Sequence, residues 1–255
     1  MTTALVTGAS AGIVREFCEQ LAARGHDLVV VARRAERLEE IKAEIEARHG
    51  VKVEVLVADL ADGADRARVE ARLADDARPV DLLVNNAGYA TAGEFVDTDP
   101  ADLAANLAVN VVPVVTLTAA ALPGMIARGR GDVLVVSSVA GFLPGRGSVY
   151  GAGKAAVTAL VRAAARSVPA GVHLTALCPG YTRTEFHARI GQERPGPGWL
   201  WMDADRVVAD GLADLAGGKV VSVPGLPYRA VTTVTRVVPR RALTSMAART
   251  ASGRG

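Results

Sequence analysis

Cysteine and an excess of charge of one sign are scarce in this sequence. Its 255 residues include only two cysteines, Cys18 and Cys178, so no disulfide framework is expected and a reducing, cytoplasmic compartment is predicted. The formal net charge is +2, which excludes a strong overall attraction to nucleic acid. We therefore expect no nucleic-acid partner.

Long apolar runs and metal-ligand patterns are also missing. The longest apolar run, residues 111–124, is interrupted by prolines and threonines and does not predict a membrane span. No basic segment followed by an apolar run precedes the first expected strand, so no secretory signal is expected. The four histidines have no metal-ligand spacing with cysteine or carboxylate groups, and no metal is expected.

What the sequence does contain is a regular alternation of short apolar runs and helical patterns. Strands are predicted at residues 4–6, 28–31, 53–57, 82–84, 133–136, 172–177 and 220–223. Helices are predicted at about 12–24, 34–48, 64–77, 100–128, 148–168 and 204–216. Because most strand runs are apolar on both faces, this α/β alternation predicts a doubly wound parallel sheet covered by helices on both faces. Ligands bind at the carboxyl ends of the strands of such a sheet.

Two segments lie outside the alternation. Residues 185–203 hold three glycines, two prolines and both tryptophans, which indicates a flap. Trp199 and Trp201 fit either a lid over an apolar substrate or an anchor for that flap. Residues 226–241 predict an amphipathic helix, which begins a basic extension, 226–255, to a catalytic domain of residues 1–225. This extension is either an ordinary solvated end or a surface for peripheral membrane contact.

The stretch TGASAGIV, from Thr7 to Val14, predicts a phosphate-binding turn between the first strand and the first helix. Glycines permit the tight turn, and the helix N-terminus directs N–H groups at a pyrophosphate. Two glycines four residues apart are a weak signal alone, because ordinary strand-to-helix turns also contain them. The residues that we assign to cofactor binding here are Gly8, Ser10, Ala11, Gly12 and Ile13.

The end of the second strand predicts which nucleotide binds. Arg33 and Arg34 stand where a carboxylate would bind the ribose 2′-hydroxyl of NAD. Two guanidinium groups instead favour the 2′-phosphate of NADP, although they could simply open a solvated helix.

The ends of the third and fourth strands supply further cofactor contacts, to the adenine and its ribose. The residues assigned there are Asp59, Leu60, Asn86, Ala87 and Gly88. Small residues at these ends let the cofactor approach the backbone. Asp59 has a second interpretation, as the N-cap of the helix that follows.

The candidate catalytic residues of the sequence are Ser138, Tyr150 and Lys154. Tyr150 and Lys154 are four residues apart and therefore share one face of a helix. We expect the ammonium to lower the pKa of the phenol from about 10, which makes Tyr150 a proton donor and acceptor near neutral pH. Such a pair is usually structural by itself. Ser138, at the end of the fifth strand, favours catalysis because its hydroxyl can orient a substrate carbonyl.

Taken together, these motifs, with Asn110 and the segment PGYTRT at 179–184, resemble the short-chain dehydrogenase/reductase family over roughly residues 3–225. The resemblance implies one domain with a seven-stranded parallel sheet and hydride transfer between NADP(H) and an alcohol or carbonyl compound. It also implies that the protein is a homodimer or homotetramer, assembled through helices that include those bearing Asn110 and Tyr150.

The same resemblance implies a role for each site residue. Tyr150 is the general acid/base, Ser138 holds the reacting oxygen, and Lys154 tunes Tyr150 and binds the nicotinamide ribose. Asn110 helps to hold a water relay behind Lys154. The residues implied at the nicotinamide are Pro179, Gly180, Thr182 and Thr184, and the two threonines face its carboxamide.

Val14 departs from the family, which has glycine at this position. Overpacking typically costs about 1–3 kcal/mol, which would weaken cofactor binding roughly 5- to 150-fold if the strain arose only in the complex. Three explanations stay open: a slightly displaced helix with a working site, weak cofactor binding, or an engineered or accidental substitution. Pro113 is a second irregularity, which could kink the helix that carries Asn110 or be tolerated without a role.

The sequence thus predicts an NADP(H)-dependent oxidoreductase that interconverts a ketone or aldehyde and an alcohol, with an apolar substrate inferred from the flap. One alternative is a nucleotide-binding regulatory protein that turns over poorly because of Val14. Another is epimerisation or dehydration on the same fold.

Overall fold

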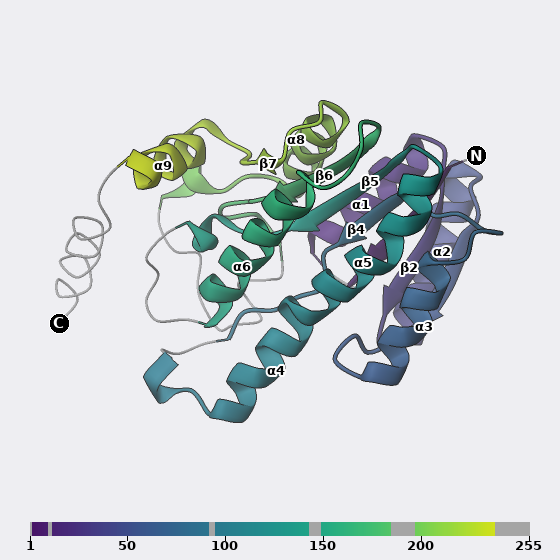
Figure 1. The fold of residues 1–255 in the computed structure, drawn as a ribbon, viewed down its shortest axis with the longest axis horizontal. Coiled ribbons are helices and arrows are strands. Elements are labelled where there is room, and N and C mark those ends of the chain that lie inside the picture. Colours follow the sequence, from purple (N-terminus) through teal and green to yellow (C-terminus); the bar gives the residue numbers. More distant parts are fainter. Residues whose placement is uncertain (1, 10–11, 92–94, 143–148, 185–196, 238–255) are drawn as a thin grey trace.

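A computed structural model describes residues 2–9, 12–91, 95–142, 149–184 and 197–237. Seven parallel strands form one sheet in the order β3-β2-β1-β4-β5-β6-β7 (Figure 1). The strands are β1 (Thr2–Thr7), β2 (His26–Ala32), β3 (Val53–Val57), β4 (Leu82–Asn85), β5 (Gly131–Val136), β6 (Val172–Leu177) and β7 (Val221–Ser222). The strand order reverses between β1 and β4, which is where ligands bind in such sheets. The predicted doubly wound sheet is confirmed.

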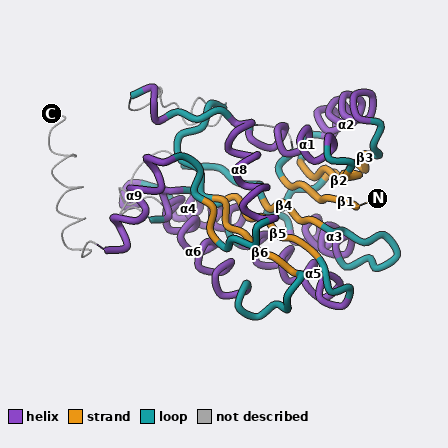
Figure 2. The backbone as a smooth tube through the Cα atoms, turned by 90° about the horizontal axis from the view of Figure 1, so that it is seen from above, coloured by secondary structure: helices purple, strands orange, loops and turns teal. Residues whose placement is uncertain are grey.

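Helices cover both faces of the sheet (Figure 2). One layer contains α1 (Ile13–Ala23), α2 (Ala35–His49) and α8 (Ala204–Ala216), and the other contains α3 (Gly63–Leu73), α5 (Val112–Ala127) and α6 (Val149–Ala164). Side chains alternate between the two cores, so that Leu5 packs in the second layer and the next residue, Val6, in the first. This burial on both faces explains why the strand sequences are apolar throughout.

The predicted helix at 100–128 is in fact two helices. α4 (Pro100–Asn110) ends before Val111, whose φ of −121° and ψ of −53° separate it from α5. The sequence suggested that Pro113 lies inside the helix that carries Asn110, but the two residues lie in different helices. Pro113 lies in the first turn of α5, where a missing N–H costs no helical hydrogen bond.

α4 and α5 together also bear on the expectation that no segment spans a membrane. Among the described residues, Pro100–Ala127 is long and apolar enough to cross a bilayer by length and composition, and an 18-residue window within it has a mean hydropathy of 1.8. Core helices pass the same test. α5 is a core helix on one side, because Val114, Leu117 and Met125 are buried in the second core.

The carboxyl-terminal part of the described chain returns to the β7 end of the sheet (Figure 1). Three short 3₁₀ helices, η1 (Phe95–Asp97), η2 (Val139–Gly141) and η3 (Gly198–Leu200), lie in loops. The predicted carboxyl-terminal helix is α9 (Leu226–Val237), and residues 238–241 of the prediction lie outside the described residues. The domain division at residue 225 stays a prediction.

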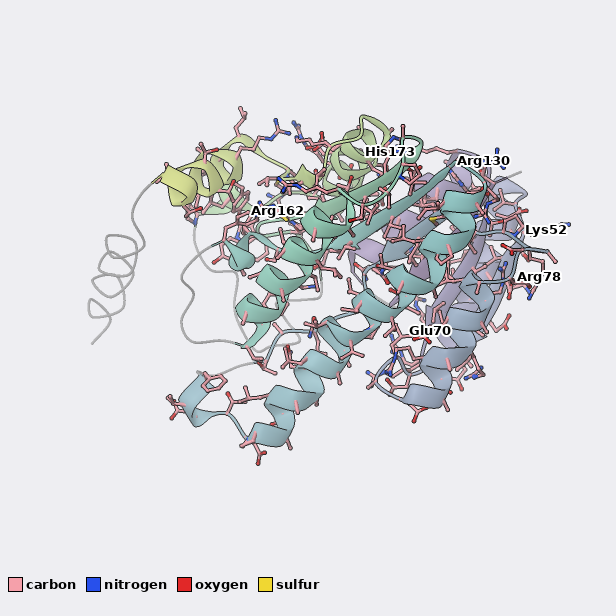
Figure 3. The ribbon with its side chains drawn as sticks, in the orientation of Figure 1. Lys52, Glu70, Arg78, Arg130, Arg162 and His173 are labelled. Atoms are coloured by element: carbon pink, nitrogen blue, oxygen red, sulfur yellow. The ribbon has the colours of Figure 1, made fainter. Side chains whose placement is uncertain are left out.

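Figure 3 labels side chains at the edge of the sheet where the strands begin. Arg130 immediately precedes β5, and His173 is the second residue of β6, so both mark the edge where the strands begin. The His173 Nδ1 lies 3.0 Å from the Asp132 Oδ1. The described site residues that follow a strand therefore lie at the opposite edge.

Candidate active site

The glycine turn joins β1 to α1 with two left-handed residues. Gly8 has a φ of 75° and Gly12 a φ of 72°, values that L side chains rarely adopt. A Cβ on Gly8 would lie 2.9 Å from the Ala87 Cα, so the turn also packs closely on the segment after β4. Gly12 precedes Ile13, the first residue of α1, whose initial N–H groups are available to an anion. Ser10 and Ala11 lie outside the described residues.

Thr7, which the sequence did not single out, fixes that packing. Its Oγ1 accepts hydrogen bonds from the backbone N–H groups of Asn86 (3.0 Å) and Ala87 (3.1 Å). The Asn86 Nδ2 in turn donates to the Thr7 carbonyl oxygen at 3.3 Å. The two predicted cofactor segments are thereby joined. Only the position of Thr7 at the end of β1 was a sequence signal for this role.

Val14 is fully buried in the first core, in the same cluster as Phe17 and Cys18. It lies in α1, and none of the described non-glycine residues has a positive φ. The fold therefore accommodates the isopropyl group without left-handed backbone strain.

Arg33 and Arg34 are exposed directly after the end of β2. The Arg33 Nη1 lies 3.8 Å from the Asp59 Oδ2, with the two side chains 76% and 42% exposed. A pair this open to solvent contributes little stability. Arg34 is the N-cap residue of α2, so the alternative interpretation, that these residues open a helix, also describes its position.

Asp59 does not cap the next helix. Its Oδ1 accepts the N–H of Ala61 at 3.0 Å, whereas the N-cap of α3 is Asp62, which accepts the N–H of Asp65. The cap interpretation of Asp59 is therefore wrong. Leu60, beside it, is buried in the second core.

The three predicted catalytic side chains come together. Tyr150 and Lys154 lie on α6, and Ser138 lies between β5 and η2. The Ser138 and Tyr150 side chains are hydrogen-bonded. The Lys154 Nζ lies 5.6 Å from the centroid of the Tyr150 ring. This is the arrangement that the spacing predicted.

The expected lowering of the Tyr150 pKa is wrong. Burial raises the pKa of Tyr150 to about 12, although its hydrogen bond with Ser138 acts in the opposite direction. Burial also lowers the pKa of Lys154 to about 8. The Lys154 Nζ donates to the Val136 carbonyl oxygen at 2.7 Å. Desolvation of the phenol thus outweighs the effect of the ammonium that the sequence suggested.

Asn110 and Lys154 both lie beside Gly88. The Asn110 Nδ2 donates to the Tyr89 carbonyl oxygen at 2.9 Å, and the Asn106 Nδ2 donates to the same oxygen at 3.0 Å. The buried Asn110 Oδ1 has no hydrogen-bond partner among the described residues. A Cβ on Gly88 would collide with this oxygen and would lie 3.5 Å from the Lys154 Nζ. Asn106 is a second support that the sequence analysis missed.

Two hydroxyl groups hold α6 against the end of β5. The Ser137 Oγ donates to the Lys154 carbonyl oxygen at 2.9 Å and lies 2.7 Å from the Thr158 Oγ1. The Thr158 Oγ1 donates to the same carbonyl at 2.9 Å. These buried bonds fix the backbone of Lys154 relative to the carboxyl end of β5. Neither residue was predicted, because a serine beside Ser138 and a threonine inside a helix carry no specific signal.

The segment 179–184 connects the two halves of the site. The Val139 N–H donates to the Pro179 carbonyl oxygen at 3.0 Å, which places the segment beside Ser138. The Thr182 Oγ1 donates to the Gly180 carbonyl oxygen at 3.1 Å. At the other end, a Cβ on Gly12 would lie 3.7 Å from the Thr184 Cβ.

The two tryptophans of the predicted flap differ. Trp201 is 6% exposed, and its ring stacks on Tyr181 with 5.1 Å between the centroids. Trp199 is 70% exposed. Trp201 is thus an anchor for the end of the flap. Residues 185–196 of the flap lie outside the described residues.

Potential metal ligands are dispersed in the part of the chain that the structure describes. No group of three or more histidine, cysteine, aspartate or glutamate side chains there could hold a metal ion. Cys178 is buried against Thr158, with 3.9 Å between the Sγ and the Oγ1, and burial raises the pKa of its thiol.

Known proteins are similar to this chain in sequence and in fold. A family model described as short chain dehydrogenase matches residues 2–195. Galactitol 2-dehydrogenase (L-tagatose-forming) of Cereibacter sphaeroides is 36% identical over 204 residues, 78% of this chain and 78% of that protein.

Two solved structures are similar over nearly the whole chain. A short-chain dehydrogenase from Sphingobium yanoikuyae in complex with NADPH has a TM-score of 0.85 and 36% identity, and the match covers 96% of both chains. The bulky-bulky ketone specific alcohol dehydrogenase from Comamonas testosteroni has a TM-score of 0.81 and 30% identity. That match covers 96% of this chain and 94% of the other.

Proposed function

Because the chain belongs to the short-chain dehydrogenase/reductase family, we propose that it is an NADP(H)-dependent oxidoreductase that interconverts a ketone or aldehyde and an alcohol. The observation that carries the proposal is the hydrogen bond between Ser138 and Tyr150, with Lys154 on the same face of α6. These groups lie at the sheet edge where the glycine turn also opens.

The residues present fit the dinucleotide. Gly8 and Gly88 keep free the space that a Cβ would fill, and the Asn110 Oδ1 is a buried acceptor without a described partner. Arg33 and Arg34 would hold the 2′-phosphate, and the NADPH complex of the Sphingobium yanoikuyae relative supports that choice. When bound, the cofactor supplies or accepts the hydride.

The side chains of this protein would manage the proton. With a pKa of about 12, Tyr150 is protonated at neutral pH and can donate to a carbonyl oxygen held by the Ser138 hydroxyl. Once Tyr150 has donated this proton, its side chain is a phenolate. Lys154, whose pKa is about 8, is cationic at pH 7 and would favour that phenolate until Tyr150 is reprotonated.

We propose an apolar carbonyl substrate. The described end of the flap exposes Trp199, and the similarity to an alcohol dehydrogenase specific for bulky-bulky ketones supports a substrate with two sizeable groups. A homodimer or homotetramer is part of the proposal, because Leu107, Val112 and Val115 are exposed on α4 and α5. The cytoplasmic location stays a prediction.

Val14 favours one other candidate, a nucleotide-binding regulatory protein that turns over poorly. The side chain fills space in the first core directly behind the glycine turn. The assembled Ser138, Tyr150 and Lys154 support the enzyme instead. Epimerisation or dehydration would appear as turnover without net consumption of cofactor.

A fluorescence titration with NADPH and NADH, followed by a screen of ketones and aldehydes, tests the proposal. We expect tighter binding of NADPH and carbonyl-dependent NADPH oxidation. The Tyr150→Phe variant should lose that activity about 10²- to 10⁴-fold, the usual contribution of a general acid. Activity that survives this substitution would contradict the assignment of Tyr150, and absence of NADPH binding would contradict the cofactor.

A further inference from the structure

Tyr228 on α9 lies against the segment 179–184, which we call the nicotinamide loop. Its side chain packs on Gly180, and any Cβ on that glycine would collide with the Tyr228 ring. Tyr228 is 8% exposed and belongs to the second core. The aromatic ring therefore occupies the space that a side chain at position 180 would need.

The Tyr228 hydroxyl makes two hydrogen bonds. It accepts the backbone N–H of Tyr181 at 2.9 Å and donates to the carbonyl oxygen of Leu200 at 2.7 Å. Tyr181 lies before residues 185–196 and Leu200 lies after them. One phenol thus joins the two chain segments that flank this part of the flap.

Backbone hydrogen bonds continue the junction. The Met202 N–H donates to the Tyr181 carbonyl oxygen at 3.0 Å, and the Arg183 N–H donates to the Met202 carbonyl oxygen at 2.9 Å. Thr182 and Met202 form a parallel bridge. The Tyr228 hydroxyl is the only side-chain group that binds the backbone of both segments among the described hydrogen bonds.

We infer that Tyr228 is a positioning residue that holds the nicotinamide loop in the shape that binds the cofactor, so that α9 acts as part of the active site. This inference rests on the proposed NADP(H) function. The loop carries Thr182 and Thr184 and lies between Ser138 and the glycine turn, so its shape affects the nicotinamide half of the site. The adenosine half, near Arg33 and Arg34, does not depend on it.

The Tyr228→Phe variant removes the hydroxyl and keeps the ring against Gly180. The matched control is Thr232→Val, which removes another buried hydroxyl of α9, one that bonds only to carbonyl oxygens of its own helix. Each protein is titrated with NADPH and with 2′,5′-ADP, which lacks the nicotinamide. Hydrogen exchange of the Tyr181 amide is measured without any ligand.

For Tyr228→Phe we expect NADPH binding to weaken about three- to ten-fold, the size expected for the one hydrogen bond that the hydroxyl makes to the nicotinamide loop. Affinity for 2′,5′-ADP should not change, and the Tyr181 amide should exchange faster. Thr232→Val should match the wild type in all three measurements. The KM for NADPH should rise more than kcat falls.

Two results would overturn the inference, and they are distinguishable. Wild-type protein that binds neither NADPH nor 2′,5′-ADP would refute the proposed cofactor site and, with it, the role of the loop. Wild-type protein that binds both, together with a Tyr228→Phe variant of equal NADPH affinity and equal Tyr181 exchange, would refute the positioning role alone.

Discussion

Lys154 lies one turn after Tyr150 on α6, with its Nζ 5.6 Å from the centroid of the tyrosine ring, and burial favours the uncharged form of both side chains. The ammonium of Lys154 is nevertheless the form that the proposed mechanism requires. The candidate active site thus holds a group whose charged form opposes folding. This conflict can be measured as a pH dependence of stability.

The stability of the Lys154→Met variant relative to wild type should fall as the pH rises from 7 to 10. The pKa of Lys154 is lowered from 10.5 to about 8, so the folded state binds its proton less tightly than the unfolded state. The folded state is most stable with respect to this group above pH 10.5, where Lys154 is uncharged in both states. That stability is lost as the pH falls through 8. Between pH 7 and pH 10, wild type should therefore gain about 2 kcal/mol relative to the variant.

Urea unfolding of both proteins at the two pH values measures this difference. The raised pKa of Tyr150 destabilises both proteins only as the pH rises above 10, so it cancels in the comparison. Lys52→Met, at an exposed position, is the control. A Lys154→Met variant whose stability relative to wild type is the same at both pH values would mean that the ammonium is not desolvated.

Val14→Gly should separate the fold from the cofactor site. Removing a fully buried side chain from a helix and introducing glycine should lower the free energy of unfolding by about 2–3 kcal/mol. If Val14 limits the approach of the dinucleotide, the same variant should bind NADPH roughly 5- to 150-fold more tightly. Chemical denaturation and fluorescence titration give the two numbers.

Val14→Ala is the matched control for this prediction, because it keeps the helix propensity and removes only part of the side chain. Its losses in stability and gains in affinity should be intermediate. A Val14→Gly protein that is less stable but binds NADPH as wild type does would assign Val14 to the core alone.

Arg33 and Arg34 should determine the preference between the two nicotinamide nucleotides. The double variant Arg33→Ala/Arg34→Ala should bind NADPH at least about tenfold more weakly, because each charge-assisted hydrogen bond contributes about 1.5–3 kcal/mol in a complex. NADH affinity should change little. Arg37→Ala is the control, since Arg37 lies in the first turn of α2 and pairs with Glu40 at 2.6 Å. Equal losses for NADPH and NADH would contradict a 2′-phosphate site.

Local spacing explains which site residues were predictable. The i and i+4 positions of Tyr150 and Lys154 fix their common face before any tertiary structure is known. Their pKa values were not predictable in the same way, because burial is set by packing. The break at Val111 was missed because a proline that disrupts a helix interior also suits a first turn.

Supports that join distant segments were also missed. Thr7 binds the backbone of Asn86, 79 residues later, and Tyr228 binds that of Tyr181, 47 residues earlier. A lone threonine or tyrosine shows nothing in sequence about such a partner. The topology places them together, because β1 neighbours β4 and the nicotinamide loop follows β6.

The last prediction concerns assembly through α4 and α5. Val112, Val115 and Ile126 are about 40% exposed, at 39%, 43% and 41%, and they recur on the face of α5 that points away from the sheet. An apolar helix face of this kind is typical of a subunit interface. We expect Val115→Glu to produce a smaller species by sedimentation velocity, because the carboxylate would be buried without a partner on association.

Val96→Glu is the control for this assembly prediction, since Val96 is 83% exposed in η1 and lies outside that face. It should sediment as wild type does. Both variants should unfold at the wild-type urea concentration when measured as monomers, because neither side chain belongs to the core. A wild-type protein that is monomeric at micromolar concentration, or a Val115→Glu variant of unchanged size, would contradict assembly through this face.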